Sequence, residues 1–168
     1  MSYISKKGLM NGVSSTQFAP NTSVTRGMFV TVLYRLENEP AVDGNSNFSD
    51  VSENAYYKNA VIWATENGVT SGVSDLTFAP EENITREQMA QMIYNYAAYK
   101  GKAIGKAVST DYADSESISD YAKSAVFWAA EKSIMTGYGN GLFSPKANAT
   151  RAEAAAVFMR LSENFERL

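Results

Sequence analysis

The stretch Asn148-Ala149-Thr150-Arg151-Ala152-Glu153 shows how this chain is organised, because two similar stretches precede it. They are Asn83-Ile84-Thr85-Arg86-Glu87-Gln88 and Ser23-Val24-Thr25-Arg26-Gly27-Met28. A Phe-Ala-Pro or Phe-Ser-Pro tripeptide lies shortly before each of them, at Phe18–Pro20, Phe78–Pro80 and Phe143–Pro145. Thr followed three residues later by Glu or Gln, ahead of an apolar periodic run, is a helix capping box. The second and third stretches fit this box and the first keeps only its Thr, so three helices are predicted.

Each predicted helix has an Arg at its first position, where a cation is disfavoured by about 0.3–1 kcal/mol. Three such residues in register, Arg26, Arg86 and Arg151, indicate a local reason. Each Arg could pair with a carboxylate of the protein, or it could join the free helix N–H groups in binding an anion from outside. Residue chemistry alone leaves both hypotheses open.

The positions behind these arginines repeat with the same spacing. The arginines are separated by 60 residues (26 to 86) and 65 residues (86 to 151). Apolar residues follow each Arg at i, i+3, i+4 and i+7, which predicts one buried face of an amphipathic helix. These faces are Phe29, Val32, Leu33 and Leu36; Met89, Met92, Ile93 and Tyr96; and Ala154, Val157, Phe158 and Leu161.

A second helix is predicted ahead of each Gly-rich turn. Its repeated face is Tyr56, Ala60, Trp63 and Ala64, then Tyr121, Ala125, Trp128 and Ala129. Gly68 is typical of a helix C-terminal stop, and Gly72 and Gly137 of the turn that follows. Ser133 replaces the first Gly in the later unit, so we expect that helix end to be closed in another way.

The earliest unit is expected to be shortened. Gly8 and Gly12 align with Gly68 and Gly72, which places Tyr3 where Trp63 stands and leaves almost no room for the preceding helix. We therefore expect a fragment boundary ahead of three units: a truncated repeat at 1–42 and full repeats at 43–105 and 106–168. The exposed face of the truncated repeat predicts self-association with another chain.

Composition narrows the functional classes. A net charge of −3 gives no support for nucleic-acid binding, and no apolar run reaches the roughly 20 residues of a membrane span. The chain has no His and no Cys, which removes thiol and imidazole catalysis and the usual zinc ligand sets. Its carboxylates recur once per unit rather than flanking one bond, so we expect no enzyme, no cofactor and no metal site.

Several segments together resemble the S-layer homology (SLH) domain family. They are Phe48-Ser49-Asp50-Val51, Ala60-Val61-Ile62-Trp63-Ala64, Gly137-Tyr138-Gly139-Asn140-Gly141-Leu142-Phe143-Ser144-Pro145 and Thr150-Arg151-Ala152-Glu153. The resemblance covers nearly the whole chain. It implies an all-α helical repeat module with a pseudo-threefold arrangement. It also implies a protein of the bacterial cell surface, cell wall or S-layer that binds secondary cell-wall polysaccharide, often with pyruvylated sugars.

The resemblance also implies roles for single residues. Arg26, Arg86 and Arg151 would meet a ketal pyruvate carboxylate. Further residues at the family's groove positions are Trp63, Trp128, Asp50, Asp114, Gly72 and Gly137. Gly27-Met28 departs from the family's Ala-Glu, which makes Arg26 the weakest match of the three arginines.

Other interpretations of these residues stay open. A Trp on an apolar helical stripe is more often core than ligand contact, and both Asp residues could cap a following segment or pair with Arg. The whole chain could instead be a helical protein–protein interaction scaffold, in which the repeated arginines are structural ion-pair partners. The anchoring hypothesis requires the three guanidinium groups to be held out to solvent beside open clefts.

Overall fold

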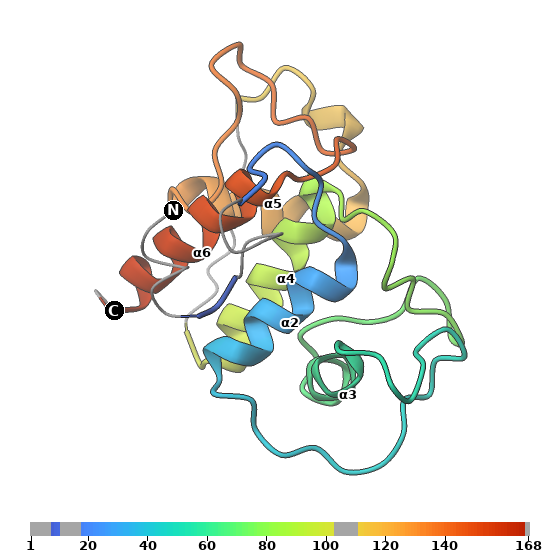
Figure 1. Cartoon of the computed structure of the whole chain (residues 1–168). Coiled ribbons are helices and arrows are strands. Elements are labelled where there is room, and N and C mark those ends of the chain that lie inside the picture. The colour runs from blue at the N-terminus through green and yellow to red at the C-terminus, as the bar shows by residue number, and fades with distance from the viewer. Residues whose placement is uncertain (1–7, 11–17, 103–110, 167–168) are drawn as a thin grey trace.

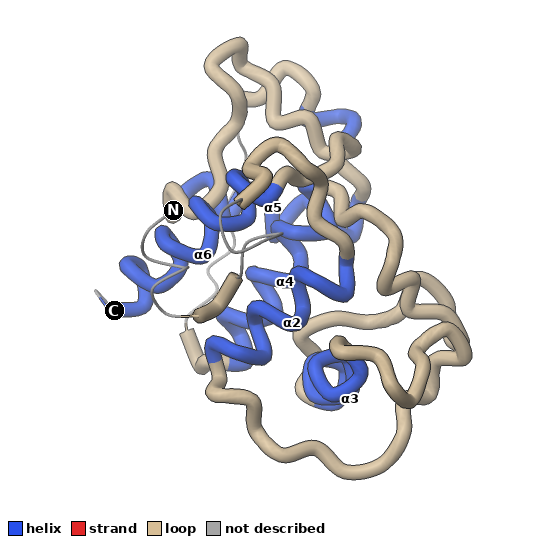
Figure 2. The backbone as a smooth tube through the Cα atoms, viewed as in Figure 1, coloured by secondary structure: helices blue, strands red, loops and turns tan. Residues whose placement is uncertain are grey.

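The computed structural model describes residues 8–10, 18–102 and 111–166. In these ranges the regular elements are helices joined by long loops (Figure 2), and the only β pairing consists of isolated bridges. The helices are α2 (Arg26–Leu36), α3 (Lys58–Glu66), α4 (Arg86–Tyr99), α5 (Lys123–Glu131) and α6 (Arg151–Glu166), with short 3-10 turns η1 (Ser115–Ser117) and η2 (Asp120–Ala122). The all-α repeat architecture is confirmed. None of the described helices has the length and apolar character that crossing a membrane requires.

The three predicted helix starts are confirmed to the exact residue. α2, α4 and α6 each begin at the repeated Arg. Thr85 and Gln88 form both bonds of a capping box, and Glu153 Oε2 likewise accepts the Thr150 N–H at 2.8 Å while Thr150 Oγ1 accepts the Glu153 N–H at 3.2 Å. Thr25 accepts only the Met28 N–H, as expected for a stretch that lacks Glu or Gln at this position.

A ring of three backbone hydrogen bonds lies where the three units meet. The Val24 N–H donates to the Ala149 carbonyl, the Ala149 N–H to the Ile84 carbonyl, and the Ile84 N–H to the Val24 carbonyl, each at 2.9 Å. All three residues are fully buried. Because each unit donates to one neighbour and accepts from the other, the ring relates the units by a pseudo-threefold axis, as expected.

The first amides of each helix donate to the neighbouring unit. The Arg26, Arg86 and Arg151 N–H groups donate to the carbonyls of Glu82, Ala147 and Thr22, each at 2.9 Å. The next amide of each helix donates to the carbonyl of a Pro in the same neighbouring loop (Pro80, Pro145 or Pro20). Helix N-terminal amides normally lack partners within their own helix. The hypothesis that free helix N–H groups bind an external anion is therefore wrong, because loop carbonyls already occupy them.

Figure 1 shows the three long helices near one another, and aromatic side chains join them. Phe29 of α2 stacks on Phe158 of α6 with ring centroids 4.8 Å apart, and Tyr96 of α4 stacks on Phe165 of α6 at 5.9 Å. The predicted helix faces are buried, apart from the partly buried Leu36. The repeat boundaries at 42/43 and 105/106 stay a prediction, and 105/106 lies outside the described residues.

The shorter helices cover the long ones, with α3 packed on α2 and α5 on α4. Trp63 and Trp128 point into this packing and are each 3% exposed. Tyr56 and Tyr121 depart from the prediction, since they precede α3 and α5 and are exposed. The helices begin only after these tyrosines, so the i, i+4 spacing does not place the rings on the buried face.

The C-terminal ends of the shorter helices share one backbone conformation. Gly68 has a φ of 67°, and Ser133 adopts the same left-handed conformation with a φ of 54°. The expectation that Ser133 would require a different closure is wrong. Gly8 also has a φ of 67°, in agreement with its predicted alignment, whereas Tyr3 and Gly12 lie outside the described residues. Self-association through the first unit stays a prediction.

We expect Ser133→Gly to stabilise the protein and Gly68→Ser to destabilise it, each by about 1 kcal/mol, because a left-handed φ is costly for residues other than Gly. A Cβ at Gly68 meets no atom within 4 Å, so the effect there is conformational rather than steric. Urea unfolding of both variants measures the two changes. Equal stability of all three proteins would contradict this account of the helix ends.

Candidate functional site: two grooves between units

The repeated arginines reach across to the neighbouring unit. Their Nε–H groups donate to the carbonyls of Phe78, Phe143 and Phe18 at 2.9, 2.8 and 2.9 Å. Each guanidinium also lies 4.8 Å from the centre of that same Phe ring. The Phe of the tripeptide in one unit is therefore the docking point for the Arg of the unit before it in the ring.

The expectation that these side chains extend into solvent is wrong. Arg26 and Arg86 are each 4% exposed and Arg151 is 7% exposed. Backbone carbonyls bind all three arginines, and the carboxylate pairing that one of the two sequence hypotheses expected is found at Arg86, with Glu153. The carbonyl oxygens accept hydrogen bonds from the guanidinium groups, which offsets part of the cost of a cation at a helix N-terminus but adds no negative charge.

Asp50 and Asp114 hold the tripeptide turns. Asp50 accepts the Phe78 and Ala79 N–H groups at 2.9 and 2.7 Å, one on each carboxylate oxygen. Asp114 binds the equivalent amides of Phe143 and Ser144 at 2.8 and 2.7 Å. The middle residue of each turn has a left-handed φ, 59° at Ala79 and 57° at Ser144. The structure thus supplies the capping interaction that the sequence left open for these aspartates.

Gly72 and Gly137 are required by close packing. A Cβ on Gly72 would lie 2.5 Å from the Phe48 ring and 2.6 Å from the Thr77 carbonyl oxygen. A Cβ on Gly137 would lie 2.5 Å from the Tyr112 ring. These glycines let the loop after each short helix approach the unit's own aromatic residue, and this loop forms one wall of a groove.

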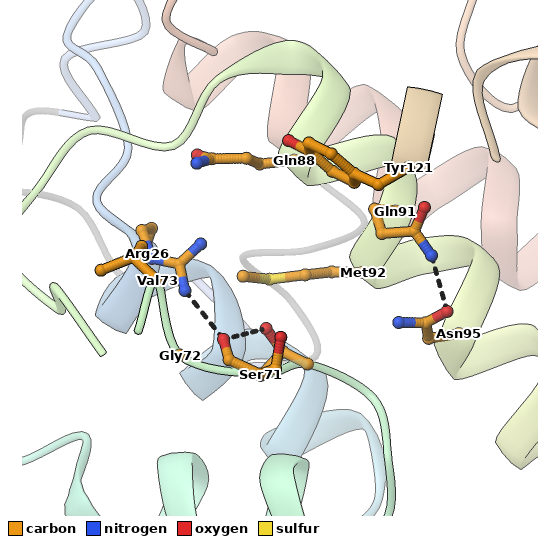
Figure 3. Close-up of a pocket in the computed structure, with 10 residues that line it drawn as sticks. Arg26, Ser71, Gly72, Val73, Gln88, Gln91, Met92, Asn95 and Tyr121 are labelled. Carbon is orange, nitrogen blue, oxygen red and sulfur yellow. Dashed lines mark hydrogen bonds between the residues drawn. The ribbon is translucent and has the colours of Figure 1, made fainter. Parts of the chain in front are cut away.

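Groove 1 is a cavity of about 360 Å³ between the first two units. Figure 3 shows Arg26 and Ser71 close together, joined by a hydrogen bond, and Gln91 and Asn95, both on α4, hydrogen-bonded to each other across from them. Its lining residues are Arg26, Thr70, Ser71, Gly72, Val73, Gln88, Gln91, Met92, Asn95 and Tyr121. Two of the predicted site residues, Arg26 and Gly72, therefore meet in one cavity.

The third unit also contributes to groove 1, through Tyr121. The buried Glu87 carboxylate accepts the Ser119 N–H at 3.0 Å and the Tyr121 hydroxyl at 3.4 Å. Partial burial of the hydroxyl of this otherwise exposed side chain, together with the Glu87 carboxylate, raises the pKa of Tyr121 to about 12, so its hydroxyl remains a donor at neutral pH. Tyr121 adds an aromatic edge to an otherwise amide-rich groove.

Groove 2 is the equivalent cavity, about 280 Å³, between the second and third units. Its lining residues are Arg86, Met135, Thr136, Gly137, Tyr138, Ala152, Glu153, Ala156, Val157 and Arg160. Arg86 Nη2 donates to the Thr136 carbonyl at 2.9 Å, as Arg26 Nη2 donates to Ser71 at 3.1 Å. Arg86 and Gly137, both predicted site residues, lie together here.

The charge of Arg86 is compensated, and that of Arg26 is not. Arg86 Nη1 donates to Glu153 Oε1 at 2.6 Å. Arg26 has no carboxylate at ion-pair distance among the described residues. Burial lowers the pKa of the Arg26 guanidinium, while the more distant Glu82 and Asp50 act to raise it. A guanidinium stays protonated in proteins, so Arg26 places a buried positive charge beside groove 1.

The remaining predicted residues lie elsewhere. Trp63, Trp128, Asp50 and Asp114 line neither groove. Arg151 makes the equivalent contacts to Phe18, and residues 11–17, which include the Gly12 that aligns with Gly72, lie outside the described residues.

Sequence analysis missed the helix residues that line the grooves, namely Gln88, Gln91 and Asn95 on α4 and Glu153, Ala156 and Arg160 on α6. In each helix they occur at i, i+3 and i+7, a spacing in the sequence that indicates a polar or small face next to the apolar one. The predictions used only the apolar face and the cap.

Comparison with known families agrees with this arrangement of three repeated units. Residues 1–27, 47–90 and 111–155 match the S-layer homology domain family, and together they make up more than half of the chain. The chain belongs to the S-layer homology family. The SLH resemblance drawn from the sequence is confirmed.

Relatives of the SLH module occur in much longer proteins. An amylopullulanase of Thermoanaerobacterium thermosulfurigenes is 37% identical over 95% of this chain, which is 9% of that protein. The surface-layer 125 kDa protein of Lysinibacillus sphaericus is 29% identical over 95% of this chain and 13% of its own length. A cellulosome-anchoring protein of Acetivibrio thermocellus is 27% identical over 92% of this chain and 35% of its own length.

The enzyme among these relatives therefore matches through a small fraction of its length, and that fraction is the SLH region. SLH domains are non-catalytic modules that associate proteins with the cell wall at the bacterial surface. The chain spans only about a tenth to a third of the length of these three relatives.

We expect Glu153→Gln to lower stability by about 1 kcal/mol at pH 7, because the partly buried carboxylate binds Arg86 and the Tyr138 hydroxyl. Burial raises the pKa of Glu153, but bonds from Tyr138 and Thr150 and the charge of Arg86 hold it below its ordinary value. This contribution is present above the unfolded pKa and is lost as pH falls through the folded pKa. Urea unfolding at pH 7 and pH 3 should show the difference from the native protein shrinking at low pH.

Glu163→Gln is the control, since Glu163 lies on the same helix at an exposed position. A Glu153→Gln effect that stays the same at both pH values would contradict the ion-pair explanation.

Proposed function

We propose that this SLH module anchors a larger protein to the bacterial cell wall by binding an anionic secondary cell-wall polysaccharide in grooves 1 and 2. The ligand we favour carries pyruvylated sugars, as the family resemblance implies. No reaction is part of this function. The observation that carries the proposal is the buried Arg26 charge, which lines groove 1 without a carboxylate partner among the described residues.

The remainder of groove 1 suits a sugar. Its wall combines backbone from residues 70–73 with the side-chain amides of Gln88, Gln91 and Asn95. Amides can donate and accept hydrogen bonds, which matches the hydroxyl groups of a saccharide. The Tyr121 ring offers an apolar surface to sugar C–H groups and a hydroxyl at its edge.

A carboxylate is the anion that best matches Arg26. A guanidinium can bind a carboxylate by charge-assisted hydrogen bonds, each worth about 1.5–3 kcal/mol. Two of the Arg26 nitrogens already donate to Phe78 and Ser71, which fixes the guanidinium plane. Nη1 is therefore held in place for an incoming acid group.

Two grooves on one module can engage one polymer. Simultaneous binding makes the second contact intramolecular, so the total affinity exceeds that of either groove. Relatives named as a surface-layer protein and a cellulosome-anchoring protein support an anchoring role for modules of this kind.

The alternative is a helical protein–protein interaction scaffold. The observation that favours it is the structural use of the arginines, which bind neighbouring carbonyls and, at Arg86, the Glu153 carboxylate. In this alternative the grooves bind a protein and the polysaccharide has no part.

Two double variants that add opposite charges to the grooves test the proposal without altering any Arg. Gln91 and Ala156 occupy equivalent groove positions on α4 and α6 and are partly exposed. We expect Gln91→Glu with Ala156→Glu to weaken binding to purified cell walls at least tenfold, about 1.4 kcal/mol, because both grooves would repel an anionic polymer. Co-sedimentation with the walls at fixed salt measures the change.

Gln91→Lys with Ala156→Lys is the matched control, because it also places a long charged side chain at both positions but with the opposite charge. It should retain or strengthen binding. Equal weakening by both pairs, or undiminished binding to walls stripped of the polysaccharide, would contradict anion recognition and support the scaffold.

A further inference from the structure

The two grooves follow one plan but carry their uncompensated positive charge at opposite ends. We call the end beside Arg26 or Arg86 the near end. The far end is formed by Asn95 in groove 1 and Arg160 in groove 2, each seven residues after Gln88 or Glu153 on its helix. Seven helical residues span about 10 Å.

At the near end a single atom, the amide nitrogen of Gln88 in place of a carboxylate oxygen of Glu153, determines whether the Arg has an ion-pair partner. The Gln88 side-chain oxygen accepts the Thr85 N–H at 3.0 Å, so the amide group that remains is an NH₂, which cannot accept from Arg26. Glu153 also uses one oxygen for its cap, accepting the Thr150 N–H at 2.8 Å. Its other oxygen is still an acceptor and binds Arg86.

Groove 2 closes its near end further with Tyr138. The Tyr138 hydroxyl donates to Glu153 at 2.6 Å, and its ring lies 4.6 Å from the Arg86 guanidinium. Phe143 lies 4.8 Å from the same group, so two aromatic rings contact it. Groove 1 has the aliphatic Val73 at the position of Tyr138, and Phe78 is the one ring among the described residues that lies against the Arg26 guanidinium.

At the far end it is groove 2, not groove 1, that carries a positive charge. The Asn95 Nδ2 group donates to the Val69 carbonyl at 3.2 Å, and the Arg160 Nη1 group reaches the equivalent Ile134 carbonyl at 3.5 Å. Both residues thus occupy the same place, but only Arg160 is charged. No carboxylate lies at ion-pair distance from Arg160 within the described ranges.

We propose that groove 1 binds the acid group of a sugar ligand at Arg26, whereas groove 2 binds it at Arg160, two helical turns away. The inference rests on the proposed function and assigns the position of the acid within each groove. The ligand class for both is a saccharide with one carboxylate. The grooves then select different placements of the acid along a polymer, despite the threefold relation of their backbones.

Exchanging residues between the grooves tests this, because each new residue already exists at the equivalent position. The probe is methyl glucuronide, with methyl glucoside as its uncharged control. The amide signals of Gly72 and Gly137, followed by NMR in the whole chain, report on groove 1 and groove 2 separately. In the native protein both amides should shift with the glucuronide and not with the glucoside.

Gln88→Glu should weaken the Gly72 response about tenfold, because the new carboxylate pairs with Arg26, and should leave Gly137 unchanged. Arg160→Asn should weaken the Gly137 response to a similar extent and leave Gly72 unchanged. Adding Glu153→Gln to Arg160→Asn should restore a Gly137 response, since Arg86 then loses its partner.

Several outcomes would overturn the inference: a Gly72 response indifferent to Gln88→Glu, a Gly137 response indifferent to Arg160→Asn, or no restoration in the double variant. If the protein still binds cell walls but the glycine responses do not change with the exchanged residues, only the present inference fails. If both glycine responses change as described but the protein does not bind cell walls, the proposed function fails instead.

Discussion

The structure depends on a cyclic exchange of hydrogen bonds between three units. Val24, Ile84 and Ala149 close the innermost ring, and the first amides of α2, α4 and α6 form further rings around it. Each Arg then adds its side chain to the next unit's Phe carbonyl. Since a buried amide without a partner is costly, each unit needs both neighbours to satisfy its polar backbone.

The same interaction explains how a groove arises. Docking the Arg of one unit on the Phe of the next brings the loop with Gly72 or Gly137 and the following long helix against the Arg. The grooves are thus by-products of the inter-unit contact, and their lining is free to differ between units. Gln88 and Glu153 make the same cap bonds to their helices, although only Glu153 also neutralises an Arg.

The sequence predicted the features that depend on neighbouring residues along the chain. Thr85 with Gln88 placed a helix start correctly, and the spacing of Met89, Met92 and Ile93 placed its buried face. It failed where long-range partners decide. The burial of Arg26 depends on the Phe78 carbonyl 52 residues away, which no local pattern reveals. Arg26 was also the weakest family match because of its own neighbours, yet its unpaired charge is decided by Gln88 of the next unit, which stands where Glu153 pairs with Arg86 in groove 2.

The direction of the hydrogen bonds in the inner ring limits the size of the assembly. Stacked solenoid repeats expose a terminal surface onto which another copy can be added. Here the Val24 N–H of the first unit donates to the third, the Ala149 N–H of the third to the second, and the Ile84 N–H of the second back to the first, so the sequence of donors and acceptors ends where it began. A fourth repeat would find no vacant acceptor at the axis, and a longer array of such repeats would have to form a second, separate ring.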